Sequence, residues 1–133
     1  MLAVPQLVTA QLVINEIAPN NRVVADEDGQ FPDWIEIMNI GAADINVQQY
    51  AITDNPDTWN KWLLPNYIIE AGERLLIFAS EKNRDCYGCP GIVNYLHTNF
   101  KLSTGETVAL YDESGNLIDS VTIGNVYATD VMA

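Results

Sequence analysis

Short apolar or alternating runs recur along the chain with turn residues between them, and this pattern limits the fold more than any other feature. Helical periodicity is missing almost everywhere, so the spacing of the apolar residues favours strands. The predicted strands are residues 12–18, 33–40, 44–53, 61–65, 73–80, 106–112 and 116–123. Because the connectors leave no segment long enough for a crossover helix, the pattern predicts an all-β chain. The expected fold is an immunoglobulin-like antiparallel β-sandwich with about seven or more short strands.

The composition agrees with one compact domain. The 133 residues are 48% hydrophobic and 18% charged, which suits a packed core and excludes a disordered segment. The net charge of -12 repels nucleic-acid phosphates and anionic lipid surfaces. The longest apolar runs, such as residues 75–79, are only as long as a strand. We therefore expect no nucleic-acid partner and no direct membrane insertion.

Carboxylates concentrate in the loop that precedes the second predicted strand. Hard cations such as Ca²⁺ are bound by several carboxylate oxygens, so Asp26, Asp28 and Asp33 are candidate calcium ligands. The spacing differs from that of an EF-hand, because the glycine of DEDG comes too early in the loop. The alternative interpretation is a solvated acidic loop without an ion.

Glu16 and Glu36 interrupt two apolar strands in equivalent ways, within INEI and WIEI. Two carboxylates on neighbouring strands could act as the acid/base pair of a weak hydrolase. That chemistry needs a cleft, which the face of a small sandwich rarely provides. We interpret both residues instead as structural groups that accept hydrogen bonds and fix the strand ends.

Trp59 lies in a polar segment, between Thr58 and Asn60, and is the tryptophan that we expect to be exposed. An exposed indole offers an apolar face on which a sugar ring can stack. Trp34 and Trp62 lie within predicted strands, so we assign them to the core. Trp59 is therefore the candidate carbohydrate contact.

His97 is the only histidine, and Cys86 and Cys89 are the only cysteines. A nucleophilic triad needs a serine or cysteine beside the histidine and an acid behind it, and no serine here lies in a nucleophile-elbow pattern. We therefore interpret His97 as a hydrogen-bonded loop residue. Cys86 and Cys89 lie in a segment whose glycine and proline indicate a turn, which leaves a loop disulfide or two free thiols open.

Four sequence blocks occur in order along the chain: INEIAPNN, DWIEIMNIG, EAGERLLIFAS and LHTNFKLSTGETVALYDESGNLIDSV. In this order they resemble the bacterial branch of the lamin-tail domain family, whose fold is an immunoglobulin-like β-sandwich, from about Leu12 to Asp130. The resemblance implies an accessory module of secreted or cell-surface bacterial proteins that is not itself an enzyme. The positions that match the family signature, to which we assign structural roles, are Glu16, Trp34, Glu36, His97, Asn99, Phe100 and Glu106.

The resemblance also suggests how the chain is organised. Residues 1–11 are expected to be an N-terminal extension or the start of a strand, and residues 12–133 the lamin-tail-like domain. We expect this domain to be a piece of a larger protein. We also expect the piece to lack the family's last strand. The first residues do not form a signal peptide, so the expected extracellular or cell-surface location rests on the resemblance alone.

The predicted function is a non-catalytic module for adhesion, targeting or protein–protein interaction. Its expected partners are a protein or polysaccharide and the neighbouring domains of a larger chain. The alternative is a calcium-stabilised carbohydrate-binding module accessory to a hydrolase, with Trp59 as the ligand contact. Calcium is the one cofactor considered.

Overall fold

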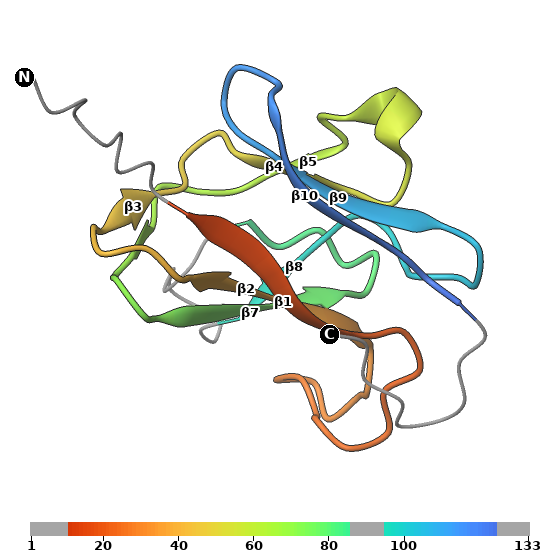
Figure 1. The fold of residues 1–133 in the computed structure, drawn as a ribbon. Helices are drawn as coiled ribbons and strands as arrows, with labels where there is room; N and C mark the ends of the chain where they lie inside the picture. Colours follow the sequence, from red (N-terminus) through yellow and green to blue (C-terminus); the bar gives the residue numbers. More distant parts are fainter. Residues whose placement is uncertain (1–10, 86–94, 125–133) are drawn as a thin grey trace, which may run out of the picture.

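The computed structural model describes residues 11–85 and 95–124, which form a β-sandwich (Figure 1). One sheet has the strand order β1 (Leu12–Ala18), β2 (Asp33–Asn39), β7 (Arg74–Ala79) and β8 (Leu96–His97). The other has the order β10 (Leu117–Thr122), β9 (Thr107–Tyr111), β4 (Ala51–Thr53) and β5 (Trp62–Leu63). A small sheet pairs β3 (Ile45–Asn46) with β6 (Ile68–Ile69), and η1 (Pro56–Thr58) is a 3₁₀ turn. The all-β sandwich predicted from the sequence is confirmed.

The apolar residues of the two large sheets meet in one core. Ile17, Ile35 and Ile37 on β1 and β2 are fully buried. They belong to the same cluster as Ile52 on β4 and Leu110 on β9. Burying an aliphatic side chain of this size contributes about 1.5–3 kcal/mol, so the alternation of apolar residues stabilises the sandwich directly.

The longer strands, β1, β2, β7, β9 and β10, have bounds close to those predicted from the sequence. The shorter strands differ more. The predicted strand 44–53 is divided into β3 and β4. The division occurs because Gln49 adopts a φ of 67° and the Tyr50 N–H donates back to the Val47 carbonyl at 2.9 Å. The sequence does not predict β6 and β8, because two residues are too few to show a periodicity.

β7 and β8 pair in parallel, whereas the sequence predicts an antiparallel arrangement throughout. Ile77 pairs with Leu96, and Phe78 pairs with His97. A parallel pair needs a connection of about a dozen residues or more, and residues 80–95 are long enough to provide it. The pairing places the sequence LHTN beside the end of β7.

The segment 96–102 is anchored by its apolar residues, as predicted. Leu96, Phe100 and Leu102 are all buried. Near the other edge of the same sheet, β1 lies beside β10, and the Ile14 N–H donates to the Asp119 carboxylate at 2.8 Å. No helix in residues 11–85 and 95–124 is long and apolar enough to cross a membrane.

Candidate functional site

The loop between β1 and β2 is closed at its base by one buried asparagine. The Oδ1 atom of Asn21 accepts hydrogen bonds from the N–H groups of Val23 (2.9 Å) and Val24 (3.0 Å). Its Nδ2 atom donates to the carbonyls of Val24 (2.6 Å) and Pro32 (2.9 Å). The two ends of the loop are therefore tied together through a single side chain.

The tip of this loop is a turn organised by Asp26. Its Oδ1 atom accepts hydrogen bonds from the N–H groups of Asp28 (2.9 Å) and Gln30 (3.0 Å). The Asp26 N–H donates to the Gln30 carbonyl at 2.7 Å, and Gly29 has a φ of 76°. Glycine suits this position because other residues rarely adopt a positive φ. The turn is thus encoded locally by the sequence DEDG.

Two cations from the segment after β7 hold the three acids of this turn. Lys82 Nζ donates to Asp26 Oδ2 at 2.5 Å and to Asp28 Oδ2 at 2.8 Å. The Arg84 guanidinium donates to Glu27 Oε1 at 2.7 Å and to Asp28 Oδ2 at 2.9 Å. The Asp26 side chain is fully buried and that of Glu27 is 7% exposed, so the carboxylates of these two residues are largely withdrawn from water, whereas Asp28 is 43% exposed.

The pKa values of the Asp26–Lys82 pair follow from these contacts. Burial by itself would raise the pKa of Asp26, but hydrogen bonds from Lys82 and from backbone N–H groups lower it below its usual value. Burial would likewise lower the pKa of Lys82, and its hydrogen bonds to Asp26 and Asp28 raise it. Both groups are therefore charged at neutral pH.

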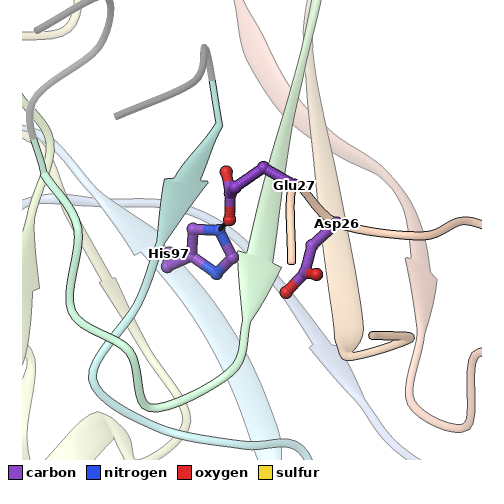
Figure 2. A group of neighbouring side chains, drawn as sticks. All are labelled: Asp26, Glu27 and His97. Atoms are coloured by element: carbon purple, nitrogen blue, oxygen red, sulfur yellow. Dashed lines mark hydrogen bonds and ion pairs between the residues drawn. The ribbon is translucent and has the colours of Figure 1, made fainter. Parts of the chain in front are cut away.

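His97 lies beneath this loop and connects it to β7 (Figure 2). Its ring is completely buried and stacks on Phe78, with 5.2 Å between ring centroids. Nδ1 lies 2.7 Å from Ser80 Oγ, and Nε2 forms a hydrogen bond with Glu27 Oε1. The backbones of His97 and Arg84 exchange two hydrogen bonds of 2.8 and 2.9 Å. The imidazole is therefore fixed on every side.

The hydrogen bonds assign the proton of the imidazole. Glu27 Oε1 accepts a hydrogen bond from Arg84 and acts as an acceptor toward His97 as well, so Nε2 carries the proton and donates it to Glu27. Nδ1 is then unprotonated and accepts from the Ser80 hydroxyl. Burial lowers the pKa of His97, and the charge of Arg84 adds to this effect while Glu27 opposes it. His97 is thus a neutral imidazole at pH 7.

Ser80, His97 and Glu27 form a continuous hydrogen-bonded line that the sequence did not suggest. No serine lies in a nucleophile-elbow sequence. Ser80 nevertheless reaches His97, because the parallel pairing of β7 with β8 brings the two residues together. Two features make this line a weak nucleophilic relay. Arg84 donates to the same Glu27 oxygen that receives the His97 proton, and the lowered pKa of His97 makes the imidazole a poor base. We interpret the line as a connection between loop and sheet.

The predicted calcium ligands do not gather around one point. Asp26 and Asp28 share Lys82, whereas Asp33 Oδ2 accepts a hydrogen bond from the Leu102 N–H at 2.9 Å. Burial raises the pKa of Asp33 to about 6. Calcium binding stays a prediction, and the structure gives it no support from this set of carboxylates.

A different group could hold a cation among the described residues. Ligand atoms of Asp26, Glu27 and His97 lie within 4.8 Å of one another, and Glu27 Oε2 is buried without a hydrogen-bond partner. A donor set with an imidazole suits a zinc-like ion better than calcium. However, Lys82 and Arg84 already neutralise two of the local charges, and an incoming ion would have to displace them. The group fits a metal poorly for this reason.

Glu16 and Glu36 face each other directly on β1 and β2. A β-bulge between Ile14 and Glu16 precedes this pair. Glu36 Oε1 accepts a hydrogen bond from the Asn15 amide at 2.8 Å and lies 3.9 Å from Arg74 Nε. The structural role predicted for Glu36 therefore has a specific partner, although it lies in mid-strand and not at a strand end.

Trp59 is half-buried, whereas the sequence predicts an exposed ring. Its ring packs against Tyr111 at 5.7 Å between centroids, and a Cβ atom placed on Gly115 would lie 3.2 Å from the indole. These neighbours cover part of the surface on which a sugar would stack. Trp34 and Trp62 are buried, as predicted.

The remaining signature residues have local structural contacts. The Asn99 side chain donates to the Lys61 carbonyl at 3.0 Å, and Glu106 Oε1 accepts from the Ser103 N–H at 2.7 Å. Phe100 is in the core. Cys86 and Cys89 lie outside the described residues, so their pairing stays open.

Two hollows lie beside the β1–β2 loop, and Phe31 lines both of them. The first has a volume of about 340 Å³ and is lined by Gln30, Phe31, Pro32, Asp33, Ala79, Ser80, Lys82 and Lys101. The second is lined by Asn20, Asn21, Arg22 and Phe31. Phe31 is 50% exposed, which is unusual for a large aromatic ring. The only local sign of this residue in the sequence is an aromatic letter within the polar stretch GQFPD, which is too little to predict a site.

Comparison with known proteins identifies the fold family. The family model described as Lamin Tail Domain matches residues 5–125. This is an immunoglobulin-like, non-enzymatic domain family, in agreement with the observed sandwich. No curated protein matches the chain. Because the match covers most of the sequence, the chain belongs to the lamin tail domain family.

Proposed function

We propose that this domain is a non-catalytic binding module of a secreted or cell-surface bacterial protein. It acts in adhesion, in targeting or in protein–protein interaction, and it binds through the end of the sandwich that carries the β1–β2 loop. The family supports an immunoglobulin-like module in general. The choice of this end rests on its geometry.

The observation that carries the proposal is the exposure of Phe31 between two hollows on a rigid loop. Asn21 closes the base of the loop, and Lys82 and Arg84 hold its tip. A loop that is already ordered loses little conformational entropy on binding. Exposed aromatic residues beside pockets are frequent anchors of protein interfaces, and loops at the end of a sandwich are frequent sites of recognition.

The proposal is tested by attachment of the purified, fluorescently labelled chain to intact bacterial cells. We expect the wild-type chain to be retained after washing, and Phe31→Ser to be retained about fivefold less, because loss of an anchoring aromatic side chain typically costs more than 1 kcal/mol. Ile68→Ser is the matched control. Ile68 is similarly exposed, at 53%, but lies on β6.

Retention of Ile68→Ser should stay within about twofold of the wild type, since a surface substitution away from the interface changes binding little. Equal retention of all three proteins would contradict the choice of this loop. Retention no greater than that of an unrelated β-sandwich would contradict the adhesive role itself.

The non-catalytic part of the proposal has its own test at Ser80, the serine beside His97. A fluorophosphonate probe labels serines that are activated as nucleophiles. We expect the probe to leave Ser80 unlabelled in intact-protein and peptide mass spectra, because Arg84 and burial weaken the relay behind it. Labelling of Ser80 that disappears in His97→Ala would show an activated serine and would reverse this conclusion.

A further inference from the structure

The first hollow lies where β2 begins and β7 ends. Asp33 and Ala79 are register partners at this point and form part of its wall. Phe31 and Pro32 line it from the β1–β2 loop, and Ser80 and Lys82 line it from the segment after β7. We refer to this 340 Å³ hollow as the Phe31 pocket. Its size is at the small end of the range for ligand sites, enough for one or two residues of a peptide.

The walls of the Phe31 pocket are held in place before any ligand binds. Lys82 joins its two sides, because its backbone N–H donates to Ser80 Oγ and its ammonium donates to Asp26 in the loop. Asp33 is fixed by the N–H of Leu102, the residue that follows Lys101. A pocket with fixed walls selects ligands by shape and charge.

The lining of the Phe31 pocket is richer in positive charge than the chain as a whole, although Lys82 and Lys101 also contact acids outside the lining. The chain carries 18 acidic and 6 basic residues, yet both Lys82 and Lys101 line this one pocket. Lys101 is 66% exposed, and its Nζ atom lies 3.6 Å from Oε1 of Glu81, which is 59% exposed. Such a surface pair is weak, so Lys101 can turn to a ligand at little cost.

Lys82 can also contribute to binding. An ammonium group has three N–H donors, and the described contacts of Lys82 Nζ use two of them, to Asp26 and Asp28. Asp33 is the one acidic residue of the pocket lining, and its Oδ2 atom is already engaged by Leu102. The pocket therefore offers two cations and one partly occupied carboxylate, beside the apolar surfaces of Phe31 and Pro32.

We propose that the Phe31 pocket binds the C-terminal residue of a partner polypeptide, with its carboxylate between Lys101 and Lys82 and its apolar side chain against Phe31. This inference rests on the proposed binding function and names the chemistry of the partner. A single carboxylate can accept hydrogen bonds from both lysines of the lining. A polyanion such as a nucleic acid would meet the repulsion of the net charge of -12.

The test uses the full chain and the peptide acetyl-Gly-Ser-Gly-Leu-Phe, prepared with either a free C-terminal carboxylate or a C-terminal amide. Binding is followed by the chemical shifts of backbone amides in an NMR titration. We expect the acid to bind about tenfold more tightly than the amide, because a charge-assisted hydrogen bond is worth more than a neutral one. N-acetylphenylalanine, tested in parallel, distinguishes a free small carboxylate from a peptide end.

Two exposed residues provide variants that leave the fold intact. Lys101→Gln should weaken binding of the acid about fivefold and leave binding of the amide unchanged, whereas Phe31→Ser should weaken both. Arg74→Gln is the matched control for charge, since Arg74 is 58% exposed on β7 and does not line the pocket. Its affinity for the acid should stay within about twofold of the wild type.

The inference would be overturned by equal affinity for acid and amide, or by an unchanged affinity in Lys101→Gln. It would also be overturned if the chemical shifts did not saturate at about 10 mM peptide, because binding weaker than that corresponds to less than about 3 kcal/mol. If N-acetylphenylalanine binds as tightly as the peptide acid, the partner is a small carboxylate and the assignment to a polypeptide end is wrong. These outcomes can be separated from failure of the proposed function. Loss of cell retention in Phe31→Ser without peptide binding would leave the binding role intact and reject the carboxylate ligand alone.

Discussion

The turns at residues 26–30 and 112–116 have the same local structure in opposite surroundings. Both read Asp-Glu-x-Gly, and in both the aspartate Oδ1 accepts hydrogen bonds from the N–H groups two and four residues later. Gly29 and Gly115 have φ values of 76° and 84°. In Figure 1 the first turn lies in the orange loop at the lower edge and the second joins β9 to β10 in blue at the top.

The glutamates of these two turns show what the surroundings change. Glu27 is buried and bonded to Arg84 and His97, whereas Glu113 is exposed at the equivalent position. The hydrogen bonds within the turn are therefore the same in both surroundings. The charged cluster is an addition to the turn, made by residues that the sheet brings to it.

The largest expected effect is the loss of stability in Glu27→Ala, with Glu113→Ala as its comparison. Glu27→Ala should lower the free energy of unfolding by about 2–4 kcal/mol, because it leaves Arg84 and the Nε2–H of His97 without their acceptor in a buried site. Glu113→Ala should change it by less than about 0.5 kcal/mol. Urea unfolding at pH 7 measures both. Similar losses in the two variants would show that the buried contacts of Glu27 add no stability beyond that of an exposed glutamate.

The two aspartates should differ less. Asp26→Asn keeps the turn geometry but removes the charge that pairs with Lys82, and we expect a loss of about 2 kcal/mol at pH 7. The pKa of Asp26 is lowered in the folded state, so its contribution is present above the unfolded value near 4 and is lost as pH falls through the folded pKa.

The stability difference between wild type and Asp26→Asn should therefore shrink in acid. The pKa of Asp112 is also lowered, by the N–H and side-chain amide of Asn116 and without a cation. Asp112→Asn should accordingly produce a smaller fall in melting temperature than Asp26→Asn at pH 7. A larger fall for Asp112→Asn would show that the local turn, and not the ion pair, dominates.

Asp33 tests the opposite effect of burial at the same end of the sandwich. Its pKa is raised to about 6, so the folded state holds the proton more tightly, and stability is lost as pH rises from the unfolded value through 6. Asn can still accept the Leu102 hydrogen bond and does not titrate. Asp33→Asn should match the wild type near pH 4 and be more stable by about 1–2 kcal/mol at pH 7.5. Thermal melts across this range check the prediction, and a constant difference would refute it.

The smallest expected effect concerns the serines. Ser80→Ala removes the donor to His97 Nδ1 and should cost about 1 kcal/mol, as one buried hydrogen bond does. Ser114 is exposed in the second turn and uses its backbone N–H, so Ser114→Ala should have almost no effect. Chemical denaturation of the two variants measures both changes in the free energy of unfolding. A neutral Ser80→Ala would mean that water or another group satisfies the imidazole.

Most of the fold could be predicted from the sequence, because alternation along one strand is a local property. The bounds of β1 follow from LVINEIA alone. β8 has two residues and pairs in parallel, so no local sequence pattern predicts it. Trp59 was expected to be exposed because its neighbours in the chain are polar, and the residues that cover it, Tyr111 and Gly115, come from the β9–β10 hairpin.

The candidate site was less accessible to sequence reasoning. His97 and the acids of the DEDG turn stand out in the sequence, but their partners do not. Glu27 and His97 are 70 positions apart, and Lys82 and Asp26 are 56 apart. A pattern of neighbours cannot specify contacts over such separations. Phe31 was missed because exposure of an apolar residue depends on which elements fail to cover it.

The longer strands, the two Asp-Glu-x-Gly turns and the family follow from the sequence, since each of these depends on residues close together in the chain. The tertiary structure alone decided that one turn became a charged, buried cluster and the other stayed an exposed hairpin. The physical reason is the parallel pairing of β8 with β7, which brings His97, Ser80 and the following cations to the first turn. Within residues 11–85 and 95–124 no strand brings cations to the second turn, and its glutamate, Glu113, remains exposed.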